Sequence, residues 1–171
     1  QVTVTLNTGA VVVLTHASAG TTLSGTYTVG ASDSTADLTV SSYQITSAVE
    51  DTAGNLMTST AVPSGANNIA GAKDLVIDNT SPSLSNISTS AVTGSSANLN
   101  FTSNESGTYY YLIYAAADSA PSAATIVAQG AAVAKGTSTH TTAAKTVATS
   151  GLSPSTPYIA YLVVKDSAGN F

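Results

Sequence analysis

Oxygen-bearing side chains gather at a few points of this chain, and their types suit a hard cation. Glu50 and Asp51 are adjacent, Asn55 follows four residues later, and Asp78 lies near the middle of the sequence. Carboxylate and amide oxygens are the ligands that Ca²⁺ takes in proteins. One hypothesis is therefore a calcium site formed by Glu50, Asp51, Asn55 and Asp78, with Glu105 a short distance further along the chain. Calcium is the one cofactor that the sequence brings into consideration.

The acidic residues also belong to a repeated five-residue pattern. It occurs as DTAGN at residues 51–55 and as DSAGN at residues 166–170, each time after an apolar run. Asp, Gly and Asn are typical turn residues, and Asp and Asn side chains often bond to nearby backbone in turns. The alternative to a cation site is therefore a purely structural turn. No loop has the carboxylate spacing of an EF-hand.

Two histidines, His16 and His140, are the only imidazoles. Neither has a carboxylate or a second histidine close by in the sequence, whereas a zinc site needs three or four convergent ligands. A Ser-His-Asp triad is assembled only in space, but no nucleophile-elbow pattern is present. We interpret both histidines as surface residues and expect no enzymatic activity.

Four tyrosines fall in the strand-like run 108–115. Successive side chains of a strand point to opposite faces, so Tyr109 and Tyr111 share one face and Tyr110 and Tyr114 the other. One face must belong to the core. Tyr110 and Tyr114 are therefore candidates for a surface that binds a carbohydrate or a protein, because an amphipathic ring stacks on either.

Composition excludes several classes of function. Charged residues make up 8% of the 171 residues, with four lysines, no arginine and a formal charge of −5. Such a chain has no basic patch to neutralise phosphates, so nucleic-acid binding is not expected. There is no cysteine, and hence no disulfide framework. No apolar run is long enough to cross a bilayer, so membrane insertion is not expected.

The apolar residues recur with the period of two that β-strands have. Val2, Val4 and Leu6, for example, alternate with polar neighbours. The Ala-rich stretch 122–135 has room for one short helical turn, but its valine and glycine content favours a strand edge or loop. The sequence therefore predicts an all-β protein. The expected strands are rich in β-branched or aromatic residues and cover 2–6, 10–14, 23–29, 38–40, 75–77, 84–88, 97–101, 108–115, 146–148 and 158–165.

A linker divides the chain. Pro82 ends the segment DNTSP at residues 78–82, and a proline biases the residue before it toward an extended form. Two domains are therefore predicted, at residues 1–80 and 81–171. About five strands precede Asp78, where a β-sandwich has roughly seven. Only Phe171 follows the second DSAGN-type turn. We expect the first domain to lack its first strands and the second its last strand.

The segment 151–158, GLSPSTPY, resembles the signature of fibronectin type III domains before their penultimate strand. The carrying residues are Leu152, Pro154 and Tyr158, and the wider stretch 83–170 looks like the fibronectin-like repeats of large bacterial surface proteins. The resemblance implies a β-sandwich. It also implies that Tyr158 is a corner tyrosine, with a buried ring and a hydroxyl bonded to backbone.

Residues 1–80 resemble the immunoglobulin-like repeats of giant bacterial adhesins and of cell-wall or S-layer proteins. The carrying segments are YTV at 27–29, TADLTV at 35–40, DTAGN at 51–55 and VIDNTSP at 76–82. In that family the last motif closes one domain and opens the next. The two resemblances together imply two tandem immunoglobulin-like and fibronectin III-like β-sandwich modules, each incomplete at one chain end.

The expected function is structural: a stalk, spacer or assembly unit of an extracellular bacterial cell-surface protein, whose partners are adjacent repeats or copies of itself. Incomplete sandwiches leave an unpaired edge, which a strand from a neighbour would complete. A filament or pilus joined by strand donation is therefore one alternative, because such head-to-tail contacts do not close. An adhesin module that binds a ligand is another.

Overall fold

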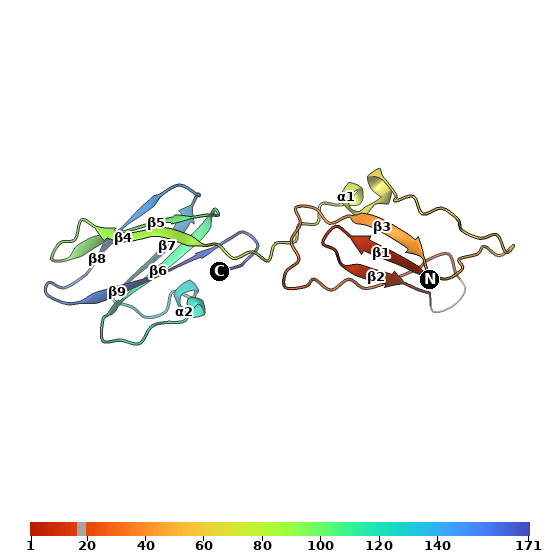
Figure 1. The fold of residues 1–171 in the computed structure, drawn as a ribbon. Coiled ribbons are helices and arrows are strands. Elements are labelled where there is room, and N and C mark those ends of the chain that lie inside the picture. The colour runs from red at the N-terminus through yellow and green to blue at the C-terminus, as the bar shows by residue number, and fades with distance from the viewer. Residues whose placement is uncertain (17–19) are drawn as a thin grey trace. The chain divides into compact units, whose positions relative to one another are not determined.

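The computed structural model describes residues 1–16 and 20–171, and it consists of two compact units (Figure 1). Unit 1 spans Gln1–Asn79 and unit 2 spans Thr80–Phe171. In the described part of the chain nearly all regular structure is β, in three sheets of three antiparallel strands. The predicted all-β class is confirmed.

Unit 1 contains one sheet with the strand order β2-β1-β3. Its strands are β1 (Val2–Leu6), β2 (Val11–Leu14) and β3 (Val40–Ile45). The turn between β1 and β2 contains Gly9, whose φ of +88° is in the region that glycine adopts without steric cost. Short helical turns follow at η1 (Gly65–Asn67) and α1 (Ile69–Ala72).

Unit 1 has a small core, because much of its chain runs in irregular segments. Leu6, Val12 and Leu38 are buried, and partly buried residues that include Tyr27 and Ile69 pack around them. The run 23–29, predicted as a strand, forms only an isolated bridge between Ser24 and Thr15. That prediction was wrong for most of its length.

Unit 2 contains two sheets, with the orders β4-β5-β8 and β7-β6-β9. All five strands predicted for this part of the chain are present. The full set is β4 (Leu84–Ser90), β5 (Ser96–Ser103), β6 (Gly107–Ala115), β7 (Ala134–His140), β8 (Lys145–Ser150) and β9 (Tyr158–Lys165).

Side chains from both sheets build the core of unit 2. Phe101 of β5 is 2% exposed and meets the ring of Tyr109 of β6 edge to face, with 5.7 Å between centroids. The face of β6 that carries Tyr109, Tyr111 and Ile113 is the core face, as the alternation predicted. The other buried members of this core are Leu99, Val147 and Val164.

One short helix replaces an expected loop or strand edge. Helix α2 (Ala123–Val127) begins after Ser122, whose hydroxyl oxygen accepts a hydrogen bond from the Thr125 N–H at 3.1 Å. This N-cap satisfies a backbone donor that the first turn leaves unpaired. Ile126 of the helix is buried, as is Leu112 of β6, and both β6 and β9 contact α2. Among the described residues no helix has the length and apolarity that a membrane span requires.

Candidate functional sites

The segment 51–55 is a turn organised by one carboxylate. Oδ1 of Asp51 accepts hydrogen bonds from the N–H groups of Ala53 and Asn55, each at 2.9 Å, and Oδ2 accepts from the Asn55 side chain at 2.8 Å. The hydrogen bond from the Asn55 side chain, followed by those from backbone N–H groups, holds the pKa of Asp51 below its usual value. A cation that took Asp51 as a ligand would compete with these bonds.

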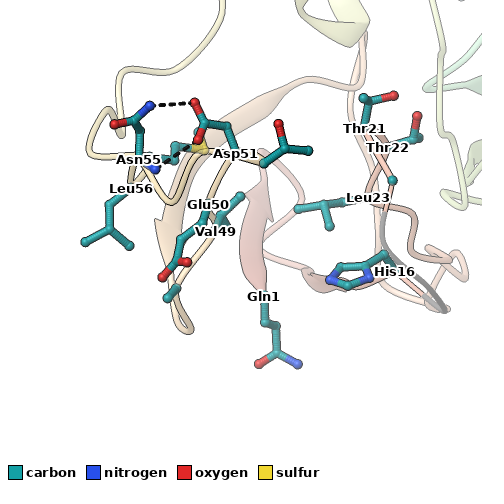
Figure 2. Close-up of a pocket in the computed structure, with 14 residues that line it drawn as sticks. Gln1, His16, Thr21, Thr22, Leu23, Val49, Glu50, Asp51, Asn55 and Leu56 are labelled. Atoms are coloured by element: carbon teal, nitrogen blue, oxygen red, sulfur yellow. Dashed lines mark hydrogen bonds between the residues drawn. The ribbon is translucent and has the colours of Figure 1, made fainter.

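Three of the four predicted calcium ligands line one hollow in unit 1. Glu50, Asp51 and Asn55 border a volume of about 820 Å³, together with His16 and Gln1 (Figure 2). Apolar side chains that include Leu23, Val49, Leu56 and Met57 also line it. Asp78 is not among the lining residues. It follows Ile77, which is bridged to Thr35.

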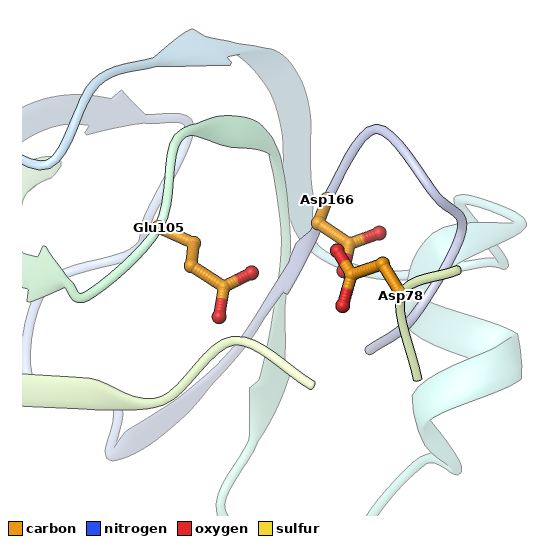
Figure 3. A group of neighbouring side chains, drawn as sticks. All are labelled: Asp78, Glu105 and Asp166. Carbon is orange, nitrogen blue, oxygen red and sulfur yellow. The ribbon is translucent and has the colours of Figure 1, made fainter. Parts of the chain in front are cut away.

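Glu105 and Asp166 come together in unit 2 (Figure 3). Glu105 lies in the turn between β5 and β6 and Asp166 directly after β9, and a carboxylate oxygen of one lies within 4.8 Å of a carboxylate oxygen of the other. Ca²⁺ takes six to eight oxygen ligands, so this pair by itself falls well short of a coordination shell. Asp78, also drawn in Figure 3, belongs to unit 1.

The second copy of the turn motif is organised in the same way, except that one backbone donor is the fourth residue of the motif, Gly169, where the first copy uses the third, Ala53. Oδ1 of Asp166 accepts from the N–H groups of Gly169 and Asn170 at 2.6 and 2.8 Å, and Oδ2 accepts from the Asn170 side chain at 2.8 Å. Desolvation raises the pKa of Asp166, but the hydrogen bonds from Asn170 and Gly169 together outweigh it, and the pKa lies below its usual value. Both five-residue repeats are therefore carboxylate-centred turns.

The two histidines lie in different surroundings. His16 is exposed, as predicted, on the rim of the hollow in unit 1. His140, at the end of β7, is only 8% exposed, so its assignment to the surface was wrong. The rings of Phe101 and Tyr109 cover it, with centroids 5.6 and 6.4 Å from that of the imidazole. Those rings come from other strands, which is why the polar residues around His140 in the sequence gave no sign of burial.

Tyr110 and Tyr114 lie on the face of β6 that points away from the main core, and both are half-buried. The ring of Tyr114 packs edge to face on Tyr161 of β9, with 6.0 Å between centroids. Leu112, between them on the same face, is fully buried. A stacking platform for a sugar requires an open ring face, and much of this face is already used for packing.

The residues of the segment 151–158 tie the entry of β9 to the rest of unit 2. The hydroxyl oxygen of Tyr158 accepts a hydrogen bond from the Ser153 N–H at 3.1 Å, and its half-buried ring packs against the core. This bond holds the pKa of Tyr158 below its usual value. Leu152 packs against the same core, whereas Pro154 is exposed. Pro82 is half-buried beside the start of β4.

Sequence reasoning missed the side chains that fasten the loops of unit 1. The Asn68 amide holds both the N–H and the carbonyl group of Val40 in β3, each at 3.0 Å. In another loop the Tyr27 hydroxyl donates to Asp33 at 2.5 Å. That bond is the main cause of a raised pKa for Tyr27 and a lowered pKa for Asp33. The sequence offered only one sign of these bonds, the presence of asparagine and aspartate near turns. Because these residue types occur throughout the chain, that sign did not single out Asn68 or Asp33.

Comparison of the chain with protein-family models, with curated proteins and with solved structures finds no match.

Proposed function

We propose that this chain is a structural part of an extracellular bacterial surface protein, made of an immunoglobulin-like and a fibronectin III-like β-sandwich module that act as spacers and carry no catalytic site. The observation that carries the proposal is that each unit has its own buried core, with one sheet in unit 1 and two in unit 2, in a chain that is poor in charge. Units of that kind can be joined in series without depending on a ligand.

Two features of unit 2 support the sandwich assignment. Consecutive strands β5 and β6 belong to different sheets, and both sheets contribute to one core. Connections that pass between two packed antiparallel sheets are typical of such sandwiches. The Tyr158 hydroxyl also bonds to backbone five residues upstream, which is how a corner tyrosine fixes the approach to its strand.

Stretching single molecules of the full chain from its two ends tests the spacer role. We expect two separate unfolding events, one for each unit, because each core must break as a cooperative whole. A chain that extends gradually, with no discrete events, would contradict the proposal.

The location is tested by antibodies against this chain, which should bind intact cells of the source organism as strongly as permeabilised cells.

Strand addition at β9 is a second candidate function, and one observation favours it. Strand β9 lies at the edge of the sheet β7-β6-β9, and only its last residue, Lys165, is charged, which leaves the run 158–164, YIAYLVV, without charge. Edge strands are usually protected by lysine, proline or a bulge, so an uncharged edge of this length is suited to pairing with a strand from a neighbour. Repetition of that contact would build a filament.

Sedimentation and electron microscopy of the purified chain separate the two candidates. Filament assembly predicts polymers that disappear in Ile159→Lys, because a lysine on the edge opposes pairing. Ile159 is 41% exposed, so the change is compatible with the fold. Val92→Lys, at a site that is 70% exposed in the loop between β4 and β5, is the control. A wild-type chain that stays monomeric over the whole concentration range would exclude the filament role and support the spacer.

A further inference from the structure

The sequence pattern Asn-X-Ser/Thr, in which X is any residue except proline, occurs four times within residues 79–106. In secreted proteins this pattern is the acceptor of N-linked sugars, which are attached to the asparagine side-chain nitrogen. The four copies begin at Asn79, Asn86, Asn100 and Asn104. Because three residues often match by chance, the surroundings of each asparagine decide whether it can be modified. An acceptor must be exposed, and its amide must be free of other bonds.

Two of these asparagines use their side chains to hold the chain in place. Nδ2 of Asn79 donates to two backbone carbonyl oxygens, at 2.9 and 3.0 Å, so both of its hydrogens are in use. Oδ1 of Asn104 accepts from the Ser83 N–H at 2.6 Å, and its Nδ2 donates to the Glu105 carboxylate at 3.3 Å. A sugar on Asn79 would displace one of its bonds, and the bond to Ser83 fixes the amide of Asn104.

Asn100 is held in the middle of a sheet. It belongs to β5, the central strand of the sheet β4-β5-β8. Its Nδ2 donates to the Ser90 hydroxyl at 3.0 Å, and its Oδ1 accepts from the Thr146 hydroxyl at 2.9 Å. The residue that follows it in the pattern, Phe101, is 2% exposed. An enzyme could not reach this copy without opening the strand.

Asn86 lies in a more accessible setting. Strand β4 is at the edge of its sheet and contains a bulge, in which Asn86 and Ile87 stand opposite the single residue Phe101. Asn86, Ile87 and Ser88 are all exposed. The one hydrogen bond of the Asn86 side chain within the described part of the chain is long, from Nδ2 to the Thr102 hydroxyl at 3.4 Å. The amide of Asn86 is therefore the most available of the four.

Backbone geometry explains only part of this copy of the pattern. Asn86 has a φ of +52°, a left-handed conformation that asparagine adopts more readily than most residues. That conformation gives a reason for asparagine at position 86, but none for the hydroxyl of Ser88 or for Ile87, which is 69% exposed. A bulky, hydrophilic sugar at this bulge would shield Ile87 and prevent the edge of β4 from pairing with another strand.

We propose that Asn86 is the acceptor of an N-linked glycan. In the transfer, Nδ2 forms a bond to the anomeric carbon of a sugar, and the bond from that carbon to a diphosphate oxygen of the activated donor breaks. The diphosphate leaves with the bonding electron pair, and Nδ2 gives one of its two protons to a base of the transferase. The proposal rests on the extracellular location proposed above, since N-linked sugars belong to secreted proteins.

Mass spectrometry of the full chain purified from its source organism tests the modification. After proteolytic digestion, the peptides that contain each of the four asparagines are compared. Electron-transfer fragmentation shows whether a sugar is on Asn86 or on a neighbouring hydroxyl. We expect Asn86 to carry sugar in more copies of the chain than Asn79, Asn100 or Asn104. An Asn86 that is bare, or no more occupied than another of the four, would overturn the proposal.

Antibody labelling of intact cells reports on the location independently of the glycan. Cells that are labelled at the surface but have a bare Asn86 would refute the glycan and leave the surface location standing. Cells that are not labelled, in which Asn86 carries sugar, would support the glycan and refute the surface location. The two failures are therefore distinguishable.

Variants produced in the source organism separate the pattern from the fold. Ser88→Ala should abolish the modification of Asn86, whereas Ser88→Thr, which keeps the pattern, should retain it. Asn86→Gly removes the acceptor and tolerates the left-handed backbone, so the peptide should be unmodified in a folded chain. Ser85→Ala, at an exposed serine of the same strand outside the pattern, is the control and should stay modified. Sugar that persists on Asn86 in Ser88→Ala, or is lost in Ser88→Thr, would contradict the assignment.

Discussion

The side chain of Asn68 connects helix α1 and the loop before it to strand β3, where no further strand of the described residues pairs with β3. Its Nδ2 group donates to the carbonyl oxygens of Val40 and Pro63, each at 3.0 Å. Its Oδ1 atom accepts from the Ile69 N–H at 2.7 Å, the Thr39 hydroxyl at 2.9 Å and the Val40 N–H at 3.0 Å. One side chain therefore caps helix α1 and pairs with strand β3 in the place of a further strand.

We expect Asn68→Ala to destabilise unit 1 by about 3–4 kcal/mol. Loss of a helix N-cap costs about 1 kcal/mol, and each further hydrogen bond contributes about 0.5–1.5 kcal/mol net. We take the lower part of that range because Asn68 is half-buried. A unit of this size has a total stability of about 4–12 kcal/mol, so the expected loss is a substantial share of it.

Hydrogen exchange at increasing urea concentration, followed by mass spectrometry of peptides that contain β3, measures the stability of unit 1 separately from that of unit 2. Asn67→Ala is the matched control, because Asn67 is the same residue type in the adjacent position and is exposed. Asn68→Asp keeps the acceptor bonds but loses both donated bonds, and we expect a loss between those of the control and of Asn68→Ala. If Asn68→Ala and Asn67→Ala differ by less than about 0.5 kcal/mol, the inferred role of Asn68 is wrong.

Three further predictions concern both units. Tyr158→Phe removes the acceptor of the Ser153 N–H and should cost unit 2 about 1 kcal/mol in urea unfolding; no loss would show that water replaces the bond. Leu112→Ala, at a side chain that is 0% exposed, should cost about 2–5 kcal/mol, whereas Ile87→Ala, 69% exposed, should change stability by less than about 0.5 kcal/mol; equal effects would contradict the packing. The pKa of Asp51 is lowered, so its turn stabilises unit 1 above the usual aspartate range near about pH 4 and loses this effect as the pH falls through the lowered value. The acid-induced fall in the stability of unit 1 should accordingly be smaller in Asp51→Ala than in the wild type, and an unchanged fall would refute this assignment.

The strands that the sequence predicted correctly carry their signal in their own residues. In β6, aromatic and apolar side chains fill both faces of one long run, and alternation alone identified the face that forms the core. Strand β7 was missed because its residues AKGTSTH are polar and contain Gly136. A Cβ at position 136 would lie 2.7 Å from the Tyr111 ring of the neighbouring strand, so this position must be glycine. Glycine is also rare within strands, and its presence therefore weakened the sequence pattern that would have predicted β7.

The prediction of a strand at residues 23–29 was wrong for the opposite reason. It has the alternation and residue types of a strand, but only Ser24 pairs with a neighbour. Tyr27 instead donates its hydroxyl to Asp33, and the Gly30 N–H bonds to the same carboxylate at 2.8 Å. Local side-chain hydrogen bonds compete with strand pairing for the path of the chain, and a pattern of apolar residues does not reveal which prevails.

The sequence by itself determined the all-β class, most strands of unit 2 and the residue types of both Asp-centred turns, because alternation and turn chemistry act between residues close along the chain. Only the tertiary structure decided that Glu105 lies beside Asp166, that Asn68 pairs with β3, and that His140 is buried under two rings. Each of these depends on partners tens of residues away. The physical reason is that burial and long-range hydrogen bonds depend on which strands pack against each other in the folded chain. The pattern of residues within one strand does not contain that information.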